Sequence, residues 1–375
     1  MKRSGQLWSG LISWPNLLES ARLAARGKRQ RPDVARFLHE LEANLCRLQY
    51  ELREGLYQPA GYRTFWIHDP KPRLISAAPF RDRVVHHALT RVLEPCFERR
   101  FTAFSFASRQ GYGQHRALAL ARDAVAGSAY VLKGDIQSYF PSIDHAILGD
   151  LLRKAIKCST TLELADRIIA GSNPQVESIA YFPGDDLFTP FERRRGLPIG
   201  NQTSQFFANV YLNPFDHFVL RELRPARYLR YVDDFLLFGD DRCALLCMAQ
   251  QARAFLETLR LRVNPRKFQV QGTADGVTFL GWRLRPGQAR LVRANVVRAR
   301  RRFRQMQVDF HEGIGTFDDI QARVQAWLGH ARFGHTVQLR RQIFDQFILN
   351  IAEHGRSAAR RRLEQQSNER PRVEP

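Results

Sequence analysis

The sequence predicts an α+β fold in which short strands lie between longer helices. Two short β-prone runs, 228–232 and 235–238, are joined by two aspartates, which is the pattern of a hairpin with a tight turn. Residues 129–136 form an apolar strand candidate, whereas 242–260 has the spacing of a helix. Because both kinds of element occur in one chain, a mixed fold is expected.

The first hundred residues are expected to form helices and one hairpin. Apolar residues recur at three- and four-residue steps over 16–56, with a basic turn at 27–32. Residues 62–77 roughly alternate between apolar and polar, and a basic, proline-bounded stretch inside them predicts a hairpin tip. A helix over 81–100 follows.

The rest of the chain continues in this mixed way. Between 283 and 304, nine arginines are interleaved with apolar residues, so one face can pack while the other meets phosphates. Further helical residues are expected to about residue 352. The other expected elements are a helix at 144–170, a polar connection at 171–195, a helix at 202–223 and a strand at 277–282.

The charge balance points to a polyanionic partner. With 58 Lys and Arg against 37 Asp and Glu, the formal net charge is +21. Nucleic acid and an anionic membrane both fit this charge, but no apolar run approaches the roughly 18 residues that a bilayer crossing needs. The start of the chain lacks the apolar stretch of a signal peptide. We therefore expect a cytoplasmic protein with no membrane partner.

The five cysteines do not indicate a disulfide framework or a zinc site. Only Cys243 and Cys247 are close together, at the four-residue spacing of one helix face. No second pair of Cys or His residues completes a zinc site. Buried or neutral thiols are expected.

Asp233 and Asp234 are the first candidates for a chemical site. Two adjacent carboxylates are electrostatically unfavourable unless a cation lies between them, although an Asp pair is also ordinary turn chemistry. Asp135 ends the 129–136 strand and would complete a cluster of three carboxylates beside the hairpin. Such clusters suit Mg²⁺, and two ions about 3.5–4 Å apart are the machinery of nucleotidyl transfer.

Five motifs, in order, resemble the palm of reverse transcriptases. They are KGDIQSYF with FPSID, then GLPIGNQTSQFFANVYLN, RYVDDFLLF, VNPRKF and FLGW. The resemblance runs from about residue 62 to 282 and implies a right-hand polymerase architecture with fingers, a palm with an antiparallel sheet, and a helical thumb. The implied domains are an N-terminal helical extension at 1–60, fingers at 61–128, a palm with the catalytic site at 129–282, a basic thumb at 283–352 and a disordered, charged tail at 353–375.

The resemblance also implies a role for each carboxylate. Asp135 and Asp233 match the principal ligands of two Mg²⁺ ions, for which Mn²⁺ can substitute, and Asp234 completes the acidic cluster. Ile136 is expected to contribute its backbone to the metal site. The primer 3′-hydroxyl would attack the α-phosphate of the nucleotide between the ions.

A dNTP pocket follows from the same resemblance. Lys71 and Arg73 match residues that clamp the triphosphate, although a solvated hairpin tip is the plain alternative. Phe140 matches the aromatic gate against a ribonucleotide 2′-hydroxyl, or is an ordinary core residue. Lys267 matches a lysine beside the leaving pyrophosphate, with Arg266 as the competing candidate.

One segment of this pocket indicates a subclass. Most reverse transcriptases have Gln before the glycine, as in QGxxxSP, whereas this chain has Ile199, then Gly200, and Gln205 at the last position. This form resembles the enzymes of diversity-generating retroelements within the group II intron-like superfamily. An aliphatic Ile199, in place of an amide that bonds the nucleotide sugar, loosens the pocket. The family implies errors at template adenines.

Contacts with the template and primer are also implied. Arg109, Gly111 and Gly113 resemble an RxGxG template contact, although a simple loop has the same pattern. Further contacts with the template or primer are expected at Gly281, Trp282, Arg298 and Arg301.

The expected function is error-prone synthesis of cDNA in a bacterial or phage retroelement. The expected partners are an RNA template, a DNA or cDNA primer strand, dNTPs and a small basic accessory protein. An antiviral-defence or otherwise domesticated bacterial reverse transcriptase would have the same chemistry. An inactive RNA-binding scaffold is the alternative from a different class.

Overall fold

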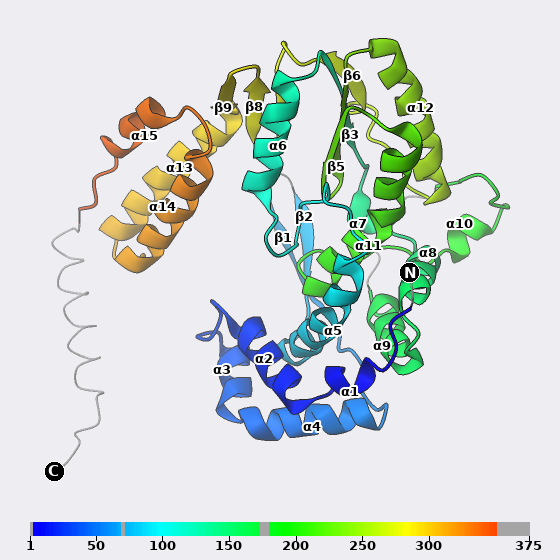
Figure 1. Ribbon diagram of the computed structural model, residues 1–375. Coiled ribbons are helices and arrows are strands. Elements are labelled where there is room, and N and C mark those ends of the chain that lie inside the picture. The colour runs from blue at the N-terminus through cyan, green and yellow to red at the C-terminus, as the bar shows by residue number, and fades with distance from the viewer. Residues whose placement is uncertain (1–2, 69–71, 173–179, 351–375) are drawn as a thin grey trace. The chain divides into compact units, whose positions relative to one another are not determined.

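The computed structural model describes residues 3–68, 72–172 and 180–350 (Figure 1). It contains helices together with three sheets, so the expected mixture of helix and sheet is confirmed. Nowhere in these ranges is a helix both long enough and apolar enough to cross a bilayer.

The chain divides into two compact units. The first combines Met1–Gly113 with Tyr130–Gln271, and the second combines Gln114–Ala129 with Gly272–Pro375. Each unit has a hydrophobic core of its own. One short segment, Gln114–Ala129, therefore leaves the first unit to join the second, and the chain then returns.

The first unit begins with helices that pack on a longer helix. The expected helical character of 16–56 and of 81–100 is confirmed. Helix α2 lies along α5, and both contribute buried side chains to the core (Figure 1). The helices are α1 (Trp8–Leu11), α2 (Trp14–Ala25), α3 (Pro32–His39), α4 (Leu41–Arg53) and α5 (Phe80–Glu98).

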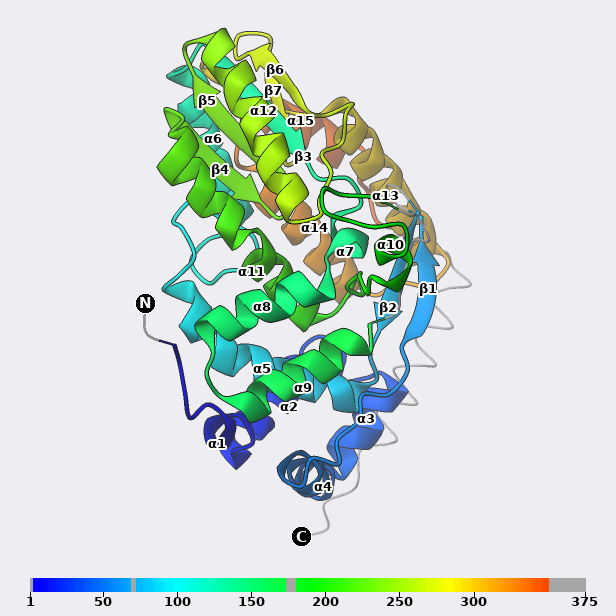
Figure 2. The ribbon, with the colours of Figure 1, turned by 90° about the vertical axis from the view of Figure 1, so that its right-hand side faces the viewer.

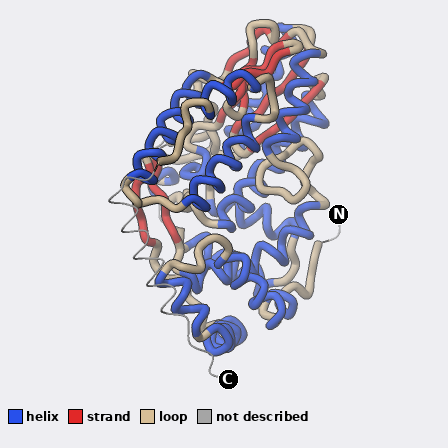
Figure 3. The backbone as a smooth tube through the Cα atoms, turned by 90° about the vertical axis from the view of Figure 1, so that its left-hand side faces the viewer, coloured by secondary structure: helices blue, strands red, loops and turns tan. Residues whose placement is uncertain are grey.

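A separate hairpin lies between α4 and α5 in the sequence. Strands β1 (Arg63–Ile67) and β2 (Arg73–Ala77) pair antiparallel, with Arg63 opposite Ala77. Every residue of β1 is exposed. The hairpin expected at 62–77 is confirmed, and Figure 3 shows it apart from the four-stranded sheet of this unit.

The four-stranded sheet forms the centre of the first unit. Its order is β4-β5-β3-β6, and both β3 and β4 run antiparallel to β5. Residues 235–238 are all buried, as expected for a strand covered on both faces. Strand β6 was not expected. The strands are β3 (Tyr130–Asp135), β4 (Arg227–Tyr231), β5 (Asp234–Gly239) and β6 (Gln269–Gly272).

Two helices replace the single helix expected at 144–170. Helix α8 (His145–Ala155) ends at Ile156, and α9 (Ser159–Ala170) begins three residues later. The break has a physical reason, because the backbone of Ser4 bonds to the Ala155 carbonyl at 2.9 Å and to the Lys157 amide at 2.7 Å, which holds this stretch extended. Figure 2 shows α8 and α9 alongside each other.

The remaining helices of the first unit include both long helices expected from the sequence. Helix α11 continues at its end into a π-helical turn, Val219–Leu223. Helix α12 packs on β3 and β5. These helices are α7 (Tyr139–Ser142), α10 (Thr189–Glu192), α11 (Gln202–Phe218) and α12 (Arg242–Thr258).

The second unit combines a small sheet with helices. The prediction of a single strand at 277–282 is wrong. Leu280 and Gly281 have φ angles of 46° and 83°, and the chain reverses at these two residues between β7 and β8. The tail at 353–375 lies outside the described residues. The elements are α6 (Gln114–Ala126), β7 (Val277–Phe279), β8 (Trp282–Arg285), β9 (Gln288–Leu291), α13 (Arg293–His311), α14 (Phe317–Ala331) and α15 (Val337–Phe344).

Candidate active site

Three carboxylates lie at one end of the four-stranded sheet. In the antiparallel register, Asp135 at the end of β3 is opposite Asp234 at the start of β5. Asp233 and Val232 form the two-residue turn between β4 and β5. The Asp233 carbonyl accepts a hydrogen bond from the Ile136 amide at 3.3 Å. The register therefore brings the three predicted acidic residues together and places the Ile136 backbone beside the turn.

A glycine makes this register sterically feasible. Gly134 is opposite Phe235, and a Cβ atom at residue 134 would lie 2.1 Å from Cζ of that ring. Any larger residue would push the two strands apart or displace the buried ring. Gly134 therefore keeps Asp135 opposite Asp234.

Burial and mutual repulsion raise the pKa values at the turn. Burial is the main cause for Asp234, and the negative charges of Asp233 and Asp135 add to it, so that its pKa rises to about 7. Burial likewise raises the pKa of Asp233, while Lys267 and Arg73 act in the opposite direction. A cation among these carboxylates would relieve the repulsion.

Asp135 is bound by two side chains from the segment after α12. Lys267 Nζ lies 2.7 Å from Asp135 Oδ1, and Asn264 Nδ2 donates to Oδ2 at 3.2 Å. Partial burial lowers the pKa of Lys267, but the hydrogen bond to Asp135 and the three carboxylate charges outweigh it and raise the pKa overall. Arg266 is exposed, so Lys267 is the residue that the structure brings to the acidic cluster.

The chemistry of these donors fits a divalent ion. Carboxylate oxygens are the ligands that Mg²⁺ prefers, and the like charges at the turn would be stabilised by it. In the side-chain positions described, no group of three or more His, Cys, Asp or Glu residues is arranged to hold a metal ion. Asp135 instead bonds to Lys267 and Asn264. The ligand set itself stays a prediction.

Arg230, which the sequence analysis missed, holds the turn from behind. Its fully buried guanidinium donates from Nε and Nη2 to Asp216 at 2.7 and 2.6 Å, and from Nη1 to the Val232 carbonyl at 2.9 Å. Val232 has a φ of 57°, which β-branched residues rarely adopt. The signal in the sequence was an arginine inside an apolar strand, which needs a buried partner.

The sequence analysis also missed Lys133, which lies close to the acidic cluster. It precedes Asp135 by two residues on β3, so both side chains lie on the same face of the strand. Burial lowers the pKa of Lys133, and the charge of Asp234 partly opposes this. The two-residue spacing in the strand was the available signal.

The residues expected around the dNTP lie at the edge of the hairpin. Arg73 begins β2 and is close enough to the aspartate turn to affect its titration. The Ile199 carbonyl accepts a hydrogen bond from the Ser76 amide at 3.0 Å, which attaches this segment to β2. Gly200 has a φ of 114°, in the region that favours glycine.

The other pocket residues have mixed surroundings. Phe140 is half-buried, with its ring centroid 5.7 Å from that of the buried Tyr139. Gln205 is exposed, and its Oε1 accepts a hydrogen bond from Ser108 Oγ at 3.0 Å. Lys71 lies outside the described residues.

Arg109, where a template contact is predicted, makes its contacts within its own loop. Its side chain is only 3% exposed, pairs with Glu98 at 2.5 Å, and donates to two backbone carbonyls. It also lies over the Tyr112 ring at 3.9 Å. Gly111 and Gly113 have φ angles of 76° and 106°, as in a tight loop. Arg109 therefore stabilises this loop, and the template contact of the segment stays a prediction.

In the second unit, Trp282 belongs to the core. It is fully buried and packs on His330 and Phe333 at ring distances of 5.6 and 5.3 Å. The predicted contact of Trp282 with template or primer stays a prediction. Gly281 forms the reverse turn, Arg298 bonds to Asn295, and Arg301 is exposed.

An acidic cluster at a strand end, with a lysine on one carboxylate, defines a candidate nucleotidyltransferase site. A family model described as "Reverse transcriptase (RNA-dependent DNA polymerase)" matches residues 68–284. This match covers more than half of the chain, and the chain belongs to the reverse transcriptase family.

The chain is also similar in sequence to two named proteins. The chain is 28% identical over 297 residues to Protein YkfC of Escherichia coli (strain K12), covering 67% of this chain and 75% of YkfC. It is 26% identical over 183 residues to Group II intron-encoded protein LtrA of Lactococcus lactis subsp. cremoris, covering 48% of this chain and 29% of LtrA. It therefore spans less than a third of the intron-encoded relative.

One solved structure is similar in part. Apo telomerase from Candida tropicalis, truncated from its C-terminal domain, has a TM-score of 0.45 and 13% sequence identity, covering 62% of this chain and 55% of that chain. A structural similarity this small gives no information about function.

Proposed function

We propose that this reverse transcriptase synthesises cDNA on an RNA template, with Asp135, Asp233 and Asp234 holding two Mg²⁺ ions. The observation that carries the proposal is the register that sets Asp135 opposite Asp234 beside the turn of Asp233. When bound, the ions would activate the primer 3′-hydroxyl and neutralise charge on the phosphates.

The protein's own side chains have further proposed roles. Lys267 would offset charge on the leaving pyrophosphate or give it a proton from Nζ, the atom that now bonds to Asp135. Arg73 would bind the triphosphate from the hairpin. Phe140 would exclude the 2′-hydroxyl of a ribonucleotide. In a right-hand architecture, the hairpin belongs to the fingers, the four-stranded sheet to the palm, and residues 283–352 to the thumb.

The proposed fidelity depends on Ile199. An aliphatic side chain at this position makes no hydrogen bond to the sugar or base, which weakens discrimination between nucleotides. We assign the chain to the diversity-generating type on this basis, with errors concentrated at template adenines. A small basic accessory protein would then assist the RNA-bound enzyme.

Primer extension on an RNA template tests the catalytic assignment. Asp234→Asn should lower the rate about a thousandfold, because several kcal/mol of charge stabilisation depend on the acidic cluster. Asp150→Asn is the matched control, since that side chain is 74% exposed on α8. Equal rates for Asp234→Asn and the wild type would remove Asp234 from the mechanism, and equal rates for Asp233→Asn as well would remove the acidic turn. Wild-type protein that binds RNA but extends no primer would support the inactive-scaffold alternative.

Sequencing of the cDNA tests the subclass. Errors should concentrate at template adenines and decrease in Ile199→Gln, whose amide can bond the nucleotide. Uniform accuracy in the wild-type product would favour the defence or domesticated reverse transcriptase. A nearby pair of near-identical repeats that differ mainly at adenines of one copy would support the retroelement at the level of the encoding locus.

A further inference from the structure

Asn201 lies where helix α11 begins, but its side chain does not cap the helix. Asn is among the residues preferred at this position, because its side-chain oxygen usually accepts a hydrogen bond from an amide of the first turn. No such bond forms here, although the backbone of Asn201 is extended, with φ −104° and ψ 149°, as a capping residue requires. The side chain is only 3% exposed. Its buried amide group therefore has another use.

The Asn201 side chain bonds to the end of strand β2 instead. Nδ2 donates to the Ser76 carbonyl at 2.9 Å, and Oδ1 accepts a hydrogen bond from the Ala78 amide at 3.3 Å. Both partners are buried, which strengthens these bonds because water competes little for them. A carboxamide supplies the donor and the acceptor together. Asp has the same length but no donor, and the hydroxyl of Ser ends one atom earlier.

These two bonds extend an attachment that the main chain begins. The Ser76 amide donates to the Ile199 carbonyl at 3.0 Å, so Ser76 bonds to residues 199 and 201 together. Between them, Gly200 lies so close to β2 that a Cβ atom on it would be 3.0 Å from Ile75 Cγ2. Asn201 therefore supplies to β2, from a side chain, the kind of hydrogen bonds that a neighbouring strand supplies from its backbone.

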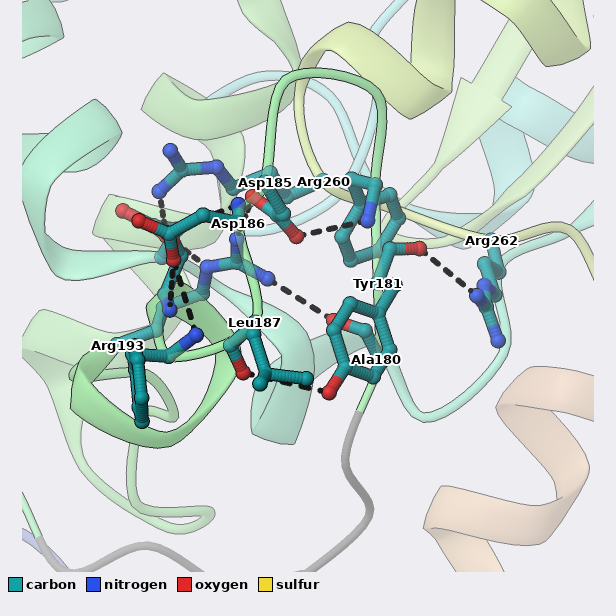
Figure 4. Close-up of polar contacts among 12 residues, drawn as sticks. Ala180, Tyr181, Asp185, Asp186, Leu187, Arg193, Arg260 and Arg262 are labelled. Atoms are coloured by element: carbon teal, nitrogen blue, oxygen red, sulfur yellow. Dashed lines mark hydrogen bonds and ion pairs between the residues drawn. The ribbon is translucent and has the colours of Figure 1, made fainter.

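The earlier part of the same segment is held by other elements. Arg193 donates from Nη1 to the Ala180 carbonyl at 3.1 Å and pairs with Asp185, as Figure 4 shows. Four residues later, the Leu197 amide donates to the Phe140 carbonyl at 2.9 Å. The attachment to β2 is thus a separate connection, and it fixes the last residues before α11.

We propose that Asn201 is a positioning residue for the incoming nucleotide, because it holds Ile199 in a fixed place relative to the hairpin. This role rests on the proposed function, in which Arg73 at the start of β2 binds the triphosphate and Ile199 affects nucleotide discrimination. Attachment of residues 199–201 to the other end of β2 sets the separation between these two parts of the nucleotide site. Without the Asn201 bonds, Ile199 is free to shift, which weakens both binding and discrimination.

Primer extension at varied dNTP concentration, with sequencing of the cDNA, tests this role. Asn201→Ser is the informative variant, because Ser caps a helix as well as Asn does but is too short to bond to both partners on β2. The KM for dNTP should rise about tenfold, as for the loss of buried hydrogen bonds, with kcat nearly unchanged and more errors. Asn201→Asp, which keeps the acceptor and lacks the donor, should show the same changes.

The matched control and a second measurement separate positioning from stability. Asn44→Ser removes an amide-to-carbonyl bond of the same kind, from Nδ2 to the Phe37 carbonyl at 3.1 Å, and should leave KM and accuracy unchanged. Amide hydrogen exchange is measured without metal or nucleotide. The amides of Ser76 and Ala78 should exchange about tenfold faster in Asn201→Ser than in the wild type.

Three outcomes would overturn the proposal. They are wild-type KM and accuracy in both Asn201 variants, an equal rise of KM in Asn44→Ser, and unchanged exchange at Ser76 and Ala78. Failure of the proposed function is distinguishable from all three, because wild-type protein that extends no primer would refute that function. The exchange of the Ser76 and Ala78 amides would still show whether Asn201 holds the segment on β2.

Discussion

Replacing Arg230 with Met tests whether this buried arginine stabilises the aspartate turn. Arg230 and Asp216 are both fully buried. The substitution leaves the Asp216 carboxylate with the Tyr228 hydroxyl, at 2.6 Å, in place of a two-pronged guanidinium. Removing one partner of a buried ion pair costs about 3–5 kcal/mol. The free energy of unfolding, measured by urea denaturation, should fall by that amount.

A double variant separates stability from positioning. Arg230→Met with Asp216→Asn removes both buried charges, and it should recover much of the lost stability. The Val232 carbonyl still lacks its charged donor, and such a hydrogen bond contributes about 1.5–3 kcal/mol. If that bond holds the turn in its left-handed conformation, primer extension should fall about tenfold or more.

The assay compares primer-extension rates at a temperature where every variant is folded. Arg227→Met, at an exposed position on the same strand, serves as the control for loss of a positive charge. A double variant that extends primers at the wild-type rate would show that Arg230 contributes to stability alone. The positioning argument would then be refuted.

Three other predictions follow from the geometry of the site. Because the pKa of Asp234 is raised, the folded, metal-free protein binds this proton more tightly than the unfolded chain does, and the stability from this group is lost as pH rises from about 4 through about 7. The free energy of unfolding, measured by urea titration, should therefore depend less on pH in Asp234→Asn than in the wild type. Equal pH profiles would contradict the raised pKa. Lys267→Ala should slow primer extension about a hundredfold, whereas Arg266→Ala should not, and similar losses in both would count against the assignment of Lys267. Gly134→Ala should lower the free energy of unfolding by about 1–3 kcal/mol through overpacking, and Phe235→Leu in the same chain should restore part of it; a thermal transition unchanged by Gly134→Ala would disprove the steric argument.

The aspartate hairpin was predictable because its pattern is local. Two β-prone runs around an Asp pair specify both the strands and the turn. The strand before Asp135 was equally predictable from its run of apolar residues. The choice between Lys267 and Arg266 could not be predicted from the sequence, because neighbouring residues in a loop point in different directions. Only the folded segment after α12 brings the lysine to Asp135.

Buried charged residues were the features that the sequence predicted least well. Arg230 and Asp216 are 14 residues apart, on a strand and a helix, and single-residue statistics place both on the surface. Arg109 shows the opposite case, since its position in a motif suggested nucleic acid whereas its donors are used by Glu98 and nearby carbonyls.

The hydrogen bond between the Ser76 amide and the Ile199 carbonyl has a consequence for evolution. This bond uses only the main chain, so the attachment of the segment to β2 is independent of which side chain residue 199 carries. Under the proposed role, the side chain sets copying accuracy, while the backbone maintains the fold. Mutation at this codon can therefore alter the error rate over generations at little cost in stability, and accuracy becomes a trait on which selection can act separately.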